Sequence, residues 1–239
     1  MANTWVISDI HGCYRTLRTL IEKQVQPSGN DELIFLGDYI DRGINSKKVI
    51  DYLIELNQSI PVLKFLRGNH EEFALISYDK EKNLKKSWFF TERNKHFQEW
   101  MKHGGNDTLK SFKIKSITEM PEMYIEWMRK TIHYLENENY IIVHAGMNFK
   151  LTDPREDTYA MMWLRDFKVE PSKIGNKKLI HGHVPVSLDF IKLTTQTNQY
   201  PFIDLDNGVY HTTKTGMGNL IAFNLKSKEM LVQRNLDMD

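Results

Sequence analysis

The feature that most constrains the fold is a series of short apolar runs, each followed closely by polar or charged residues. Residues 5–8, 33–36 and 62–66 form such runs, and Asp9, Asp38 and Arg67 come just after them. Stretches of helical periodicity separate these runs, and strand-like runs return at residues 140–143, 179–180, 220–225 and 230–232. Strands that alternate with helices predict an α/β fold, in which binding and catalytic residues gather at the carboxyl ends of the strands.

Residues 72–139 have a different pattern, which is rich in lysine and glutamate and mostly helical. We expect them to form a helical cap inserted into a single domain that spans residues 1–239. Trp88, Trp100 and Trp127 fall at helical spacing, which favours a place in the core of this cap. The turn-rich segments 198–208 and 211–218 are expected to be loops.

Charge and cysteine content exclude several classes of protein. The 239 residues contain 32 Lys+Arg and 31 Asp+Glu, so no generic basic face for nucleic acid is expected. Cys13 is the single cysteine and cannot form an internal disulfide, which favours a reducing compartment and a cytoplasmic location. No apolar run approaches the roughly 18 residues that a membrane span requires. The sequence indicates nothing about the oligomeric state.

Five polar motifs, at residues 8–12, 37–43, 67–71, 143–146 and 181–183, follow the apolar runs. Together they supply two carboxylates, three imidazoles and one amide oxygen, a donor set that suits two divalent cations and, without thiolates, excludes a zinc finger. Asp38 is the natural bridge, because a carboxylate has two oxygens and can bind two metals at once. The predicted ligands are Asp9, His11 and Asp38 for one ion, and Asp38, Asn69, His144 and His183 for the other.

The charge of such a centre indicates its chemistry. Two aspartates facing two divalent ions leave a net positive site, which would attract an anionic phosphate ester. A water shared by two such ions loses a proton near neutral pH and becomes a nucleophile. The six candidate ligands therefore predict hydrolysis of a phosphoester.

The Asp-x-His-Gly, Gly-Asp-x-x-Asp-Arg-Gly and Leu-Arg-Gly-Asn-His-Glu motifs of this chain closely resemble those of the calcineurin-like metallophosphoesterases. The resemblance is to the phosphoprotein phosphatase branch, which also contains the symmetrical diadenosine tetraphosphatases, and it extends from about Trp5 to Gly208. It implies a four-layer sandwich of two mixed β-sheets flanked by helices. It also implies two divalent metals, with manganese expected first, although iron, zinc and cobalt would accept the same ligands.

The same resemblance implies roles for residues beyond the metal ligands. His70 is similar to the family's general acid for the leaving oxygen, and Asp41 to the carboxylate that orients it, while a metal-bridging hydroxide attacks. Arg42 resembles a phosphate clamp, Arg165 resembles the second one, and Arg67 is a third candidate, since guanidinium groups bind phosphate oxygens in a bidentate fork.

Some positions depart from the family pattern or leave alternatives open. Ser8 replaces the usual glycine and Val184 the usual threonine, but neither position is a ligand. His181 precedes Gly182-His183, and we expect His183 rather than His181 to bind metal. Asp204 and Asp206 are either partners of a metal-binding imidazole or, more simply, turn residues, and surface positions are expected for the remaining histidines, His96, His103, His133 and His211.

The motifs leave the substrate open. The leading hypothesis is a phosphomonoesterase resembling a serine/threonine protein phosphatase, and the alternative is a symmetrical dinucleoside polyphosphate hydrolase. Both need the same metals and clamps, so the partner is a phosphorylated protein or a small phosphoester or nucleotide. A phosphodiesterase is less favoured because Arg42 and Arg165 together suit a terminal phosphate. A scaffold without catalysis is disfavoured because all six ligand positions are filled.

Overall fold

The structure is a computed structural model that describes residues 2–60, 62–83 and 94–238, so Trp88 of the expected cap core lies outside the described residues. Its described strands form two mixed sheets. The first has the order β3-β2-β1-β8-β9 and the second the order β4-β5-β6-β7. In the first sheet β1, β2 and β3 are parallel, and in the second β5, β6 and β7 are parallel. The strands are β1 (Thr4–Ile7), β2 (Glu32–Phe35), β3 (Val62–Phe65), β4 (Tyr134–Glu136), β5 (Tyr140–Val143), β6 (Lys178–His181), β7 (Phe202–Asp204), β8 (Asn219–Asn224) and β9 (Met230–Arg234).

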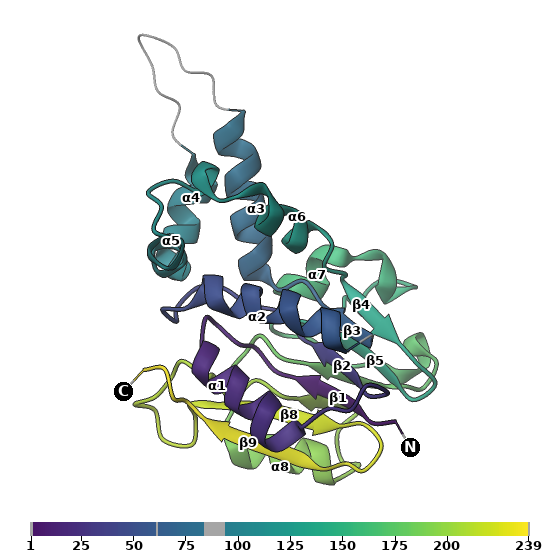
Figure 1. Cartoon of the computed structure of the whole chain (residues 1–239). Helices are drawn as coiled ribbons and strands as arrows, with labels where there is room; N and C mark the ends of the chain where they lie inside the picture. Colours follow the sequence, from purple (N-terminus) through teal and green to yellow (C-terminus); the bar gives the residue numbers. More distant parts are fainter. Residues whose placement is uncertain (1, 61, 84–93, 239) are drawn as a thin grey trace.

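Helices cover the outer faces of both sheets, which gives the expected four-layer α/β/β/α arrangement (Figure 1). The α-helices are α1 (Tyr14–Thr19), α2 (Ser46–Ser59), α3 (Asn69–Lys82), α4 (Lys95–Trp100), α5 (Asn106–Phe112), α6 (Glu122–Arg129), α7 (Thr158–Trp163) and α8 (Leu188–Gln196). Short π- and 3-10 segments are η1 (Leu20–Val25), η2 (Met101–Gly105), η3 (Ile117–Glu119), η4 (Pro154–Glu156) and η5 (Pro171–Ile174).

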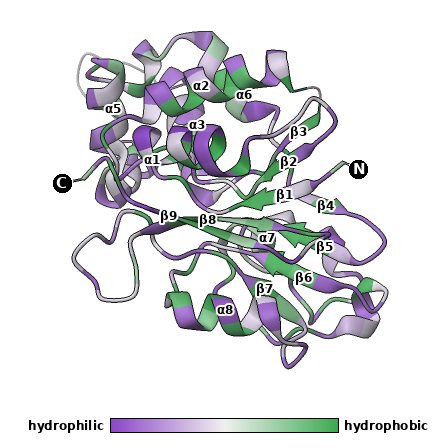
Figure 2. Cartoon of the chain, turned by 60° about the horizontal axis from the view of Figure 1, so that its bottom comes forward, coloured by the Kyte–Doolittle hydropathy of each residue, from purple (hydrophilic) through white to green (hydrophobic). Residues whose placement is uncertain are grey.

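Alternation along each strand explains why the strands form continuous apolar runs. Val6 of β1 points into the core between the two sheets, whereas Trp5 and Ile7 pack against the helices outside the first sheet. In β5, Ile142 likewise belongs to the core between the sheets, and Ile141 packs against the residues that cover the second sheet. Figure 2 shows the strands of both sheets mainly in the colour of hydrophobic residues. Strands buried on both faces need apolar residues at successive positions.

The segment expected to be an inserted cap contains α3, η2, η3 and α4 to α6, of which α3, α4 and α5 project away from the sheets (Figure 1). Two expectations need correction. Residues 134–136 form β4, an edge strand antiparallel to β5, rather than the last part of a helical segment. Residues 202–204 form β7, which pairs with β6, within the segment expected to be a loop. Both strands have only three residues, too few for a period to emerge from the sequence.

The topology brings the polar motifs to one place. The motifs that follow the parallel strands β1, β2 and β3 lie at one edge of the first sheet, and those that follow β5 and β6 lie at the corresponding edge of the second. Cys13 is buried as a free thiol at the start of α1. Among the described helices, none combines the length and the apolarity that a membrane span requires.

Candidate metal centre

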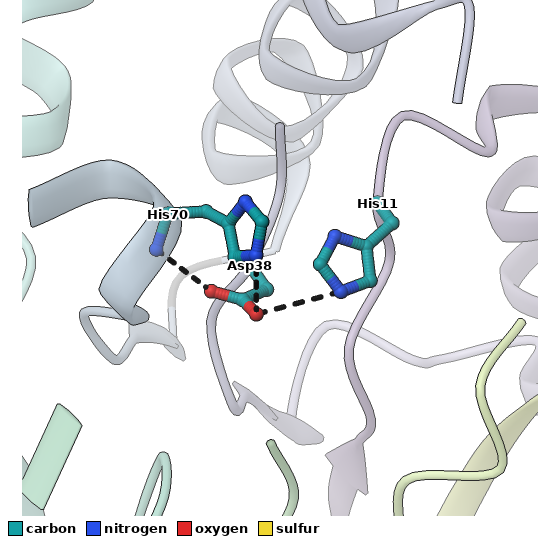
Figure 3. A group of neighbouring side chains, drawn as sticks. All are labelled: His11, Asp38 and His70. Atoms are coloured by element: carbon teal, nitrogen blue, oxygen red, sulfur yellow. Dashed lines mark hydrogen bonds and ion pairs between the residues drawn. The ribbon is translucent and has the colours of Figure 1, made fainter. Parts of the chain in front are cut away.

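The carboxylate of Asp38 lies at the centre of the site, where the chain turns after β2. Its Oδ2 is 3.4 Å from Nε2 of His11 and 3.8 Å from Nε2 of His70 (Figure 3). Its Oδ1 is 3.5 Å from Nε2 of His144 and accepts a hydrogen bond from the backbone N–H of His70, at the first turn of α3. Each carboxylate oxygen thus faces a different set of ligand atoms, which is the arrangement a bridging carboxylate needs.

The second set of ligand atoms comes from three other segments. Nε2 of His144 and Nδ1 of His183 are 3.2 Å apart, and both approach Oδ1 of Asn69, at 3.2 and 3.0 Å. These three ligand atoms converge on one point, and no pattern of hydrogen bonds among them satisfies all three. They are therefore better suited to bind a cation than to bind one another. His11, Asp38 and His70 form one compact group of potential ligand atoms, and Asp38, His144 and His183 form another.

Backbone contacts orient the imidazoles. Nδ1 of His11 lies 3.2 Å from the carbonyl oxygen of Ile40, and Nδ1 of His144 lies 3.0 Å from that of Leu36. A proton on each Nδ1 leaves the Nε2 lone pair directed at Asp38, as a metal ligand requires. Burial lowers the pKa of His11, with a contribution from Arg42, and burial also lowers the pKa of His144, so both rings are neutral near pH 7.

His183 presents the opposite ring nitrogen to the site. Its Nδ1 faces Asn69 and His144, while its buried Nε2 has no hydrogen-bond partner among the described residues. Burial, together with the neighbouring His144, lowers the pKa of His183 to about 3. The ring is therefore neutral and available as a ligand over the physiological pH range.

Asp9 lies beside the second group of ligands rather than within either compact group. Its Oδ2 accepts the backbone N–H of His183 at 3.0 Å, and its buried Oδ1 has no partner among the described residues. Burial raises the pKa of Asp9, and the nearby Asp206 and Asp38 raise it further. An unpaired, buried carboxylate oxygen next to other carboxylates is costly without a cation, so Asp9 also fits a metal ligand.

The backbone of the site is strained. His11, Asp38, Asp41, Arg42 and His183 all have positive φ values, between 46° and 74°. Residues other than glycine rarely adopt this left-handed backbone conformation. Such conformations cluster at functional sites, where the surrounding structure holds them in place.

Close backbone packing explains one of the motif glycines. A Cβ added to Gly68 would lie 2.1 Å from Oδ1 of Asp38, so only glycine lets the loop after β3 pass the central carboxylate. Immediately after it, α3 begins at Asn69 and directs the backbone N–H of His70 to Oδ1 of Asp38. The positive end of a helix then stabilises the negative charge of Asp38.

Glu71 holds the loop that carries Asp38, a role that the sequence did not reveal. Its two carboxylate oxygens accept the backbone N–H groups of Gly68, Asp38, Tyr39 and Ile40, at 3.1, 2.9, 2.8 and 3.3 Å. This buried glutamate fastens the start of α3 to the turn after β2. The last residue of the Leu-Arg-Gly-Asn-His-Glu motif thereby fixes the geometry of the site without entering the cluster.

The proposed acid and its orienting carboxylate are in direct contact. Nδ1 of His70 lies 2.7 Å from Oδ2 of Asp41, and both residues are buried. Burial acts to lower the pKa of His70, but Asp38 and Asp41 outweigh this effect and raise it above its usual value. Because Nδ1 is engaged by Asp41, Nε2 is the atom that faces the centre of the site.

Two residues of the inserted helices also hold Asp41, and sequence reasoning missed both. The indole N–H of Trp100 donates to Oδ2 of Asp41 at 2.8 Å, and the hydroxyl of Thr108 donates to Oδ1 at 2.6 Å. Trp100 is fully buried, as expected for cap core, and Trp127 packs against Tyr39 and Phe65 of the main core. The cap therefore contacts the carboxylate of the proposed acid directly.

The three arginines expected to bind phosphate have different surroundings. The Arg42 guanidinium carbon lies 4.1 Å above the ring of Tyr210, and its Nη1 is 3.4 Å from Nε2 of His11, so it borders the site. Arg165 is exposed and close enough to His183 to contribute to the lowering of that residue's pKa. Arg67 is not brought to the cluster.

The guanidinium of Arg67 donates instead to Glu72, to the Thr131 hydroxyl, and to the carbonyl oxygens of Met128, Arg129 and Thr131. It anchors the end of α6. We therefore do not retain Arg67 as a phosphate-binding residue. Its position after β3 gave the wrong signal because its guanidinium donates to residues at the end of α6 and to Glu72 instead of to the ligand cluster.

The other candidate histidines and aspartates lie outside the two compact ligand groups. His103 is not a simple surface residue, because it stacks on Phe73 with ring centroids 5.1 Å apart and lies 6.4 Å from His70. His181 is buried between aromatic rings, outside both compact ligand groups. Asp204 and Asp206 accept backbone N–H groups two residues ahead, as turn residues do, although both are buried.

The fold and the site together define a class of protein: a four-layer α/β/β/α sandwich with histidine and carboxylate ligands converging at the sheet edge. The model of the calcineurin-like phosphoesterase family matches residues 2–209. The chain belongs to this family of phosphoester hydrolases, which confirms the resemblance of its motifs and the expected fold.

Individual relatives are more distant. A symmetrical bis(5'-nucleosyl)-tetraphosphatase of Coxiella burnetii (strain RSA 331 / Henzerling II) is 29% identical over 149 residues, which are 61% of this chain and 42% of that protein. One from Buchnera aphidicola subsp. Baizongia pistaciae is 31% identical over 147 residues, 61% of this chain and 44% of that protein. The matched segment thus spans less than half the length of these relatives.

A crystal structure described as a proposed diadenosine tetraphosphatase shares the fold, with a TM-score of 0.61 and 16% identity. The match covers 96% of this chain and 92% of that chain. At this level of identity, the likeness shows a common architecture and nothing more.

Proposed function

We propose that the chain hydrolyses phosphoesters with two divalent ions held by Asp9, His11, Asp38, Asn69, His144 and His183. The observation that carries this proposal is the division of Asp38 between the two groups of ligand atoms, with Oδ2 facing His11 and Oδ1 facing His144. When bound, two such ions would activate water and neutralise charge on a phosphate. Manganese is the metal that we propose, with iron, zinc and cobalt compatible with the same ligands.

The remaining roles belong to the chain's own side chains. Arg42 would bind phosphate oxygens, held against the ring of Tyr210, and the exposed Arg165 would approach from the side of His183. His70 would give the proton on Nε2 to the departing oxygen, while Asp41 keeps the ring oriented through Nδ1.

For the substrate we propose a dinucleoside polyphosphate cleaved symmetrically, rather than a phosphoprotein. The two relatives described above are both named symmetrical bis(5'-nucleosyl)-tetraphosphatases, so they favour the alternative hypothesis over the leading one. In the proposed reaction, the oxygen of water forms a bond to one of the two central phosphorus atoms. The bridging P–O bond breaks, and the bridging oxygen leaves with the other nucleoside diphosphate and receives the proton.

A substrate panel tests this proposal. With manganese present, the protein is offered diadenosine tetraphosphate, a phosphoserine peptide, p-nitrophenyl phosphate and a bis-ester. We expect diadenosine tetraphosphate to give the highest kcat/KM and ADP as the sole nucleotide product. A higher kcat/KM for the phosphopeptide would restore the protein phosphatase hypothesis, and products of AMP and ATP would contradict symmetrical cleavage.

For the cellular location we propose the cytoplasm. A free, buried Cys13 is compatible with a cytoplasmic protein, where thiols stay reduced. Fractionation of cells that produce the chain at native levels would test it, and recovery with the membrane or the secreted fraction would contradict it.

A further inference from the structure

We propose that a pocket beside α7 binds the nucleobase of the substrate, with the ring of Tyr159 as its stacking platform. This inference rests on the proposed function and adds the part of the site that recognises the nucleoside. The pocket, here called the Tyr159 pocket, has a volume of about 600 Å³, and its lining includes Asn148, Lys150, Tyr159, Trp163, Arg165 and Phe167. Ligand pockets in proteins typically have volumes of about 300–1,000 Å³.

Tyr159 is unusual in its exposure. Its relative exposure is 67%, and it is the single aromatic residue among the large hydrophobic residues that lie exposed in the described part of the chain. Its ring stacks on that of Trp163, with centroids 5.8 Å apart and an interplanar angle of 18°. Both rings of this stacked pair line the pocket. A planar heteroaromatic base would extend such a stack, and every base has a π-face for this contact.

A line of aromatic rings connects the pocket to the proposed acid. Trp163 packs edge-on against Phe73, with centroids 4.6 Å apart, and Phe73 lies 6.5 Å from the ring of His70. The Trp163 indole nitrogen is buried without a hydrogen-bond partner among the described residues.

Arg165 connects the pocket to the metal centre on another side. It lines the Tyr159 pocket and also a smaller adjoining pocket that reaches Gly182 and Val184, the two neighbours of His183. A nucleotide with its base on Tyr159 would thus direct its phosphates past a guanidinium toward the proposed metal ligands. The same arginine that was expected to clamp phosphate stands between the two parts of the site.

The charge of the lining favours a neutral ring over a second phosphate group. Three cationic side chains, Lys150, Arg165 and Lys168, are balanced by Asp157, Asp166 and Glu170. Asp157 is already committed, since it accepts the N–H of Ala160 and caps α7. A base with both donors and acceptors on its edge suits such a balanced wall, whereas an isolated phosphate would require a net positive one.

The test separates recognition of the base from recognition of phosphate. ADP and inorganic pyrophosphate are compared as competitive inhibitors of p-nitrophenyl phosphate hydrolysis, because they share a diphosphate and differ in the nucleoside. The proteins are the manganese-loaded wild type, Tyr159→Ala and the matched control Tyr159→Phe, which keeps the ring. Tyr159 is exposed, so folding should survive both changes, and circular dichroism and thermal melting verify this.

We expect Tyr159→Ala to raise the inhibition constant of ADP by about 10-fold or more, the usual loss when a base-stacking side chain is truncated. The constant for pyrophosphate should change by less than about 2-fold, and Tyr159→Phe should bind ADP within about 2-fold of the wild type. An unchanged constant for ADP, or equal increases for ADP and pyrophosphate, would overturn the inference.

The same proteins distinguish failure of the pocket from failure of the proposed function. If diadenosine tetraphosphate is not hydrolysed but inhibition by ADP depends on Tyr159, the proposed function fails and the pocket stands. If diadenosine tetraphosphate is hydrolysed and its KM is unchanged in Tyr159→Ala, the pocket fails and the proposed function stands.

Discussion

Replacing His70 by asparagine should expose the role of the proposed acid through the leaving group. In the structure, Nδ1 of His70 is held by Asp41 at 2.7 Å, and Nε2 lies 3.8 Å from Oδ2 of Asp38, at the edge of the ligand cluster. The imidazole is therefore oriented by one carboxylate and directed at the place where the phosphate would bind. Asparagine removes the transferable proton and leaves the six proposed ligands in place.

The size of the loss follows from how much each leaving oxygen needs that proton. An alkoxide is a poor leaving group, so His70→Asn should slow the hydrolysis of β-glycerol phosphate by about 10²–10⁴-fold, which is the usual contribution of a positioned general acid. A nucleoside diphosphate leaves through a phosphate oxygen, whose pKa is only about 6. The rate of diadenosine tetraphosphate hydrolysis should therefore fall by less than about 10-fold. Loss on p-nitrophenyl phosphate should also be small, because p-nitrophenolate leaves readily.

The assay is kcat for the three substrates in wild type, His70→Asn and Asp41→Asn, with the metal content of each protein measured in parallel. Asp41→Asn should show the same bias more mildly, because Asp41 orients the imidazole and does not itself transfer the proton. Equal losses on all three substrates, or loss of metal from His70→Asn, would refute the assignment and make His70 a ligand or a phosphate-binding residue.

Three further predictions concern the bridge, the cap and the surface. Asp38→Asn should weaken manganese binding and lower the turnover rate together. Two tightly bound ions in calorimetry, combined with an unchanged turnover rate, would exclude a bridging role. Trp100→Phe removes one donor to the carboxylate that orients the acid, so kcat on β-glycerol phosphate should fall about 2- to 10-fold; an unchanged rate would mean that the cap does not position the acid. Arg155 and Lys177 lower the pKa of Glu136 to about 2, so its stabilisation is present above its unfolded pKa of about 4.3 and is lost as pH falls toward 2. Glu136→Gln should therefore cost about 0.5–1 kcal/mol of unfolding free energy at pH 7, and a cost undiminished at pH 2 in urea titrations would contradict this.

The apolar runs predicted the alternation of strands and helices, because strands buried on both faces leave a largely apolar signal, whereas the four-layer arrangement was implied by the resemblance of the motifs. Val6 and Ile7 face opposite cores, so the run that contains them has no polar residue until the strand ends. The three-residue strands β4 and β7 left no such signal. β4 pairs with β5, the next strand along the chain, whereas β7 pairs with β6, which lies 23 residues earlier in the register. The formation of β7 is therefore a tertiary effect rather than a local preference.

A site residue could be predicted where its amino-acid type and its position after a strand are enough to indicate its role. Asp38, Asn69 and His144 each follow a strand, and parallel strands bring such positions together. Contacts made at long range were not predictable, as with Trp100, which reaches Asp41 from 59 positions away. The prediction for Arg67 failed for a similar reason, because all partners of its guanidinium except Glu72 lie more than 60 residues ahead, at or just after the end of α6.

Locating the metals is the most direct test of the proposed binuclear centre. Crystals of the protein grown with manganese and measured at the manganese absorption edge would place the ions in an anomalous difference map. We predict two peaks about 3.5–4 Å apart, each bonded to one oxygen of Asp38, with His11 at one ion and His144 and His183 at the other. A single peak, or two peaks that do not share Asp38, would contradict the binuclear centre on which the proposed function depends.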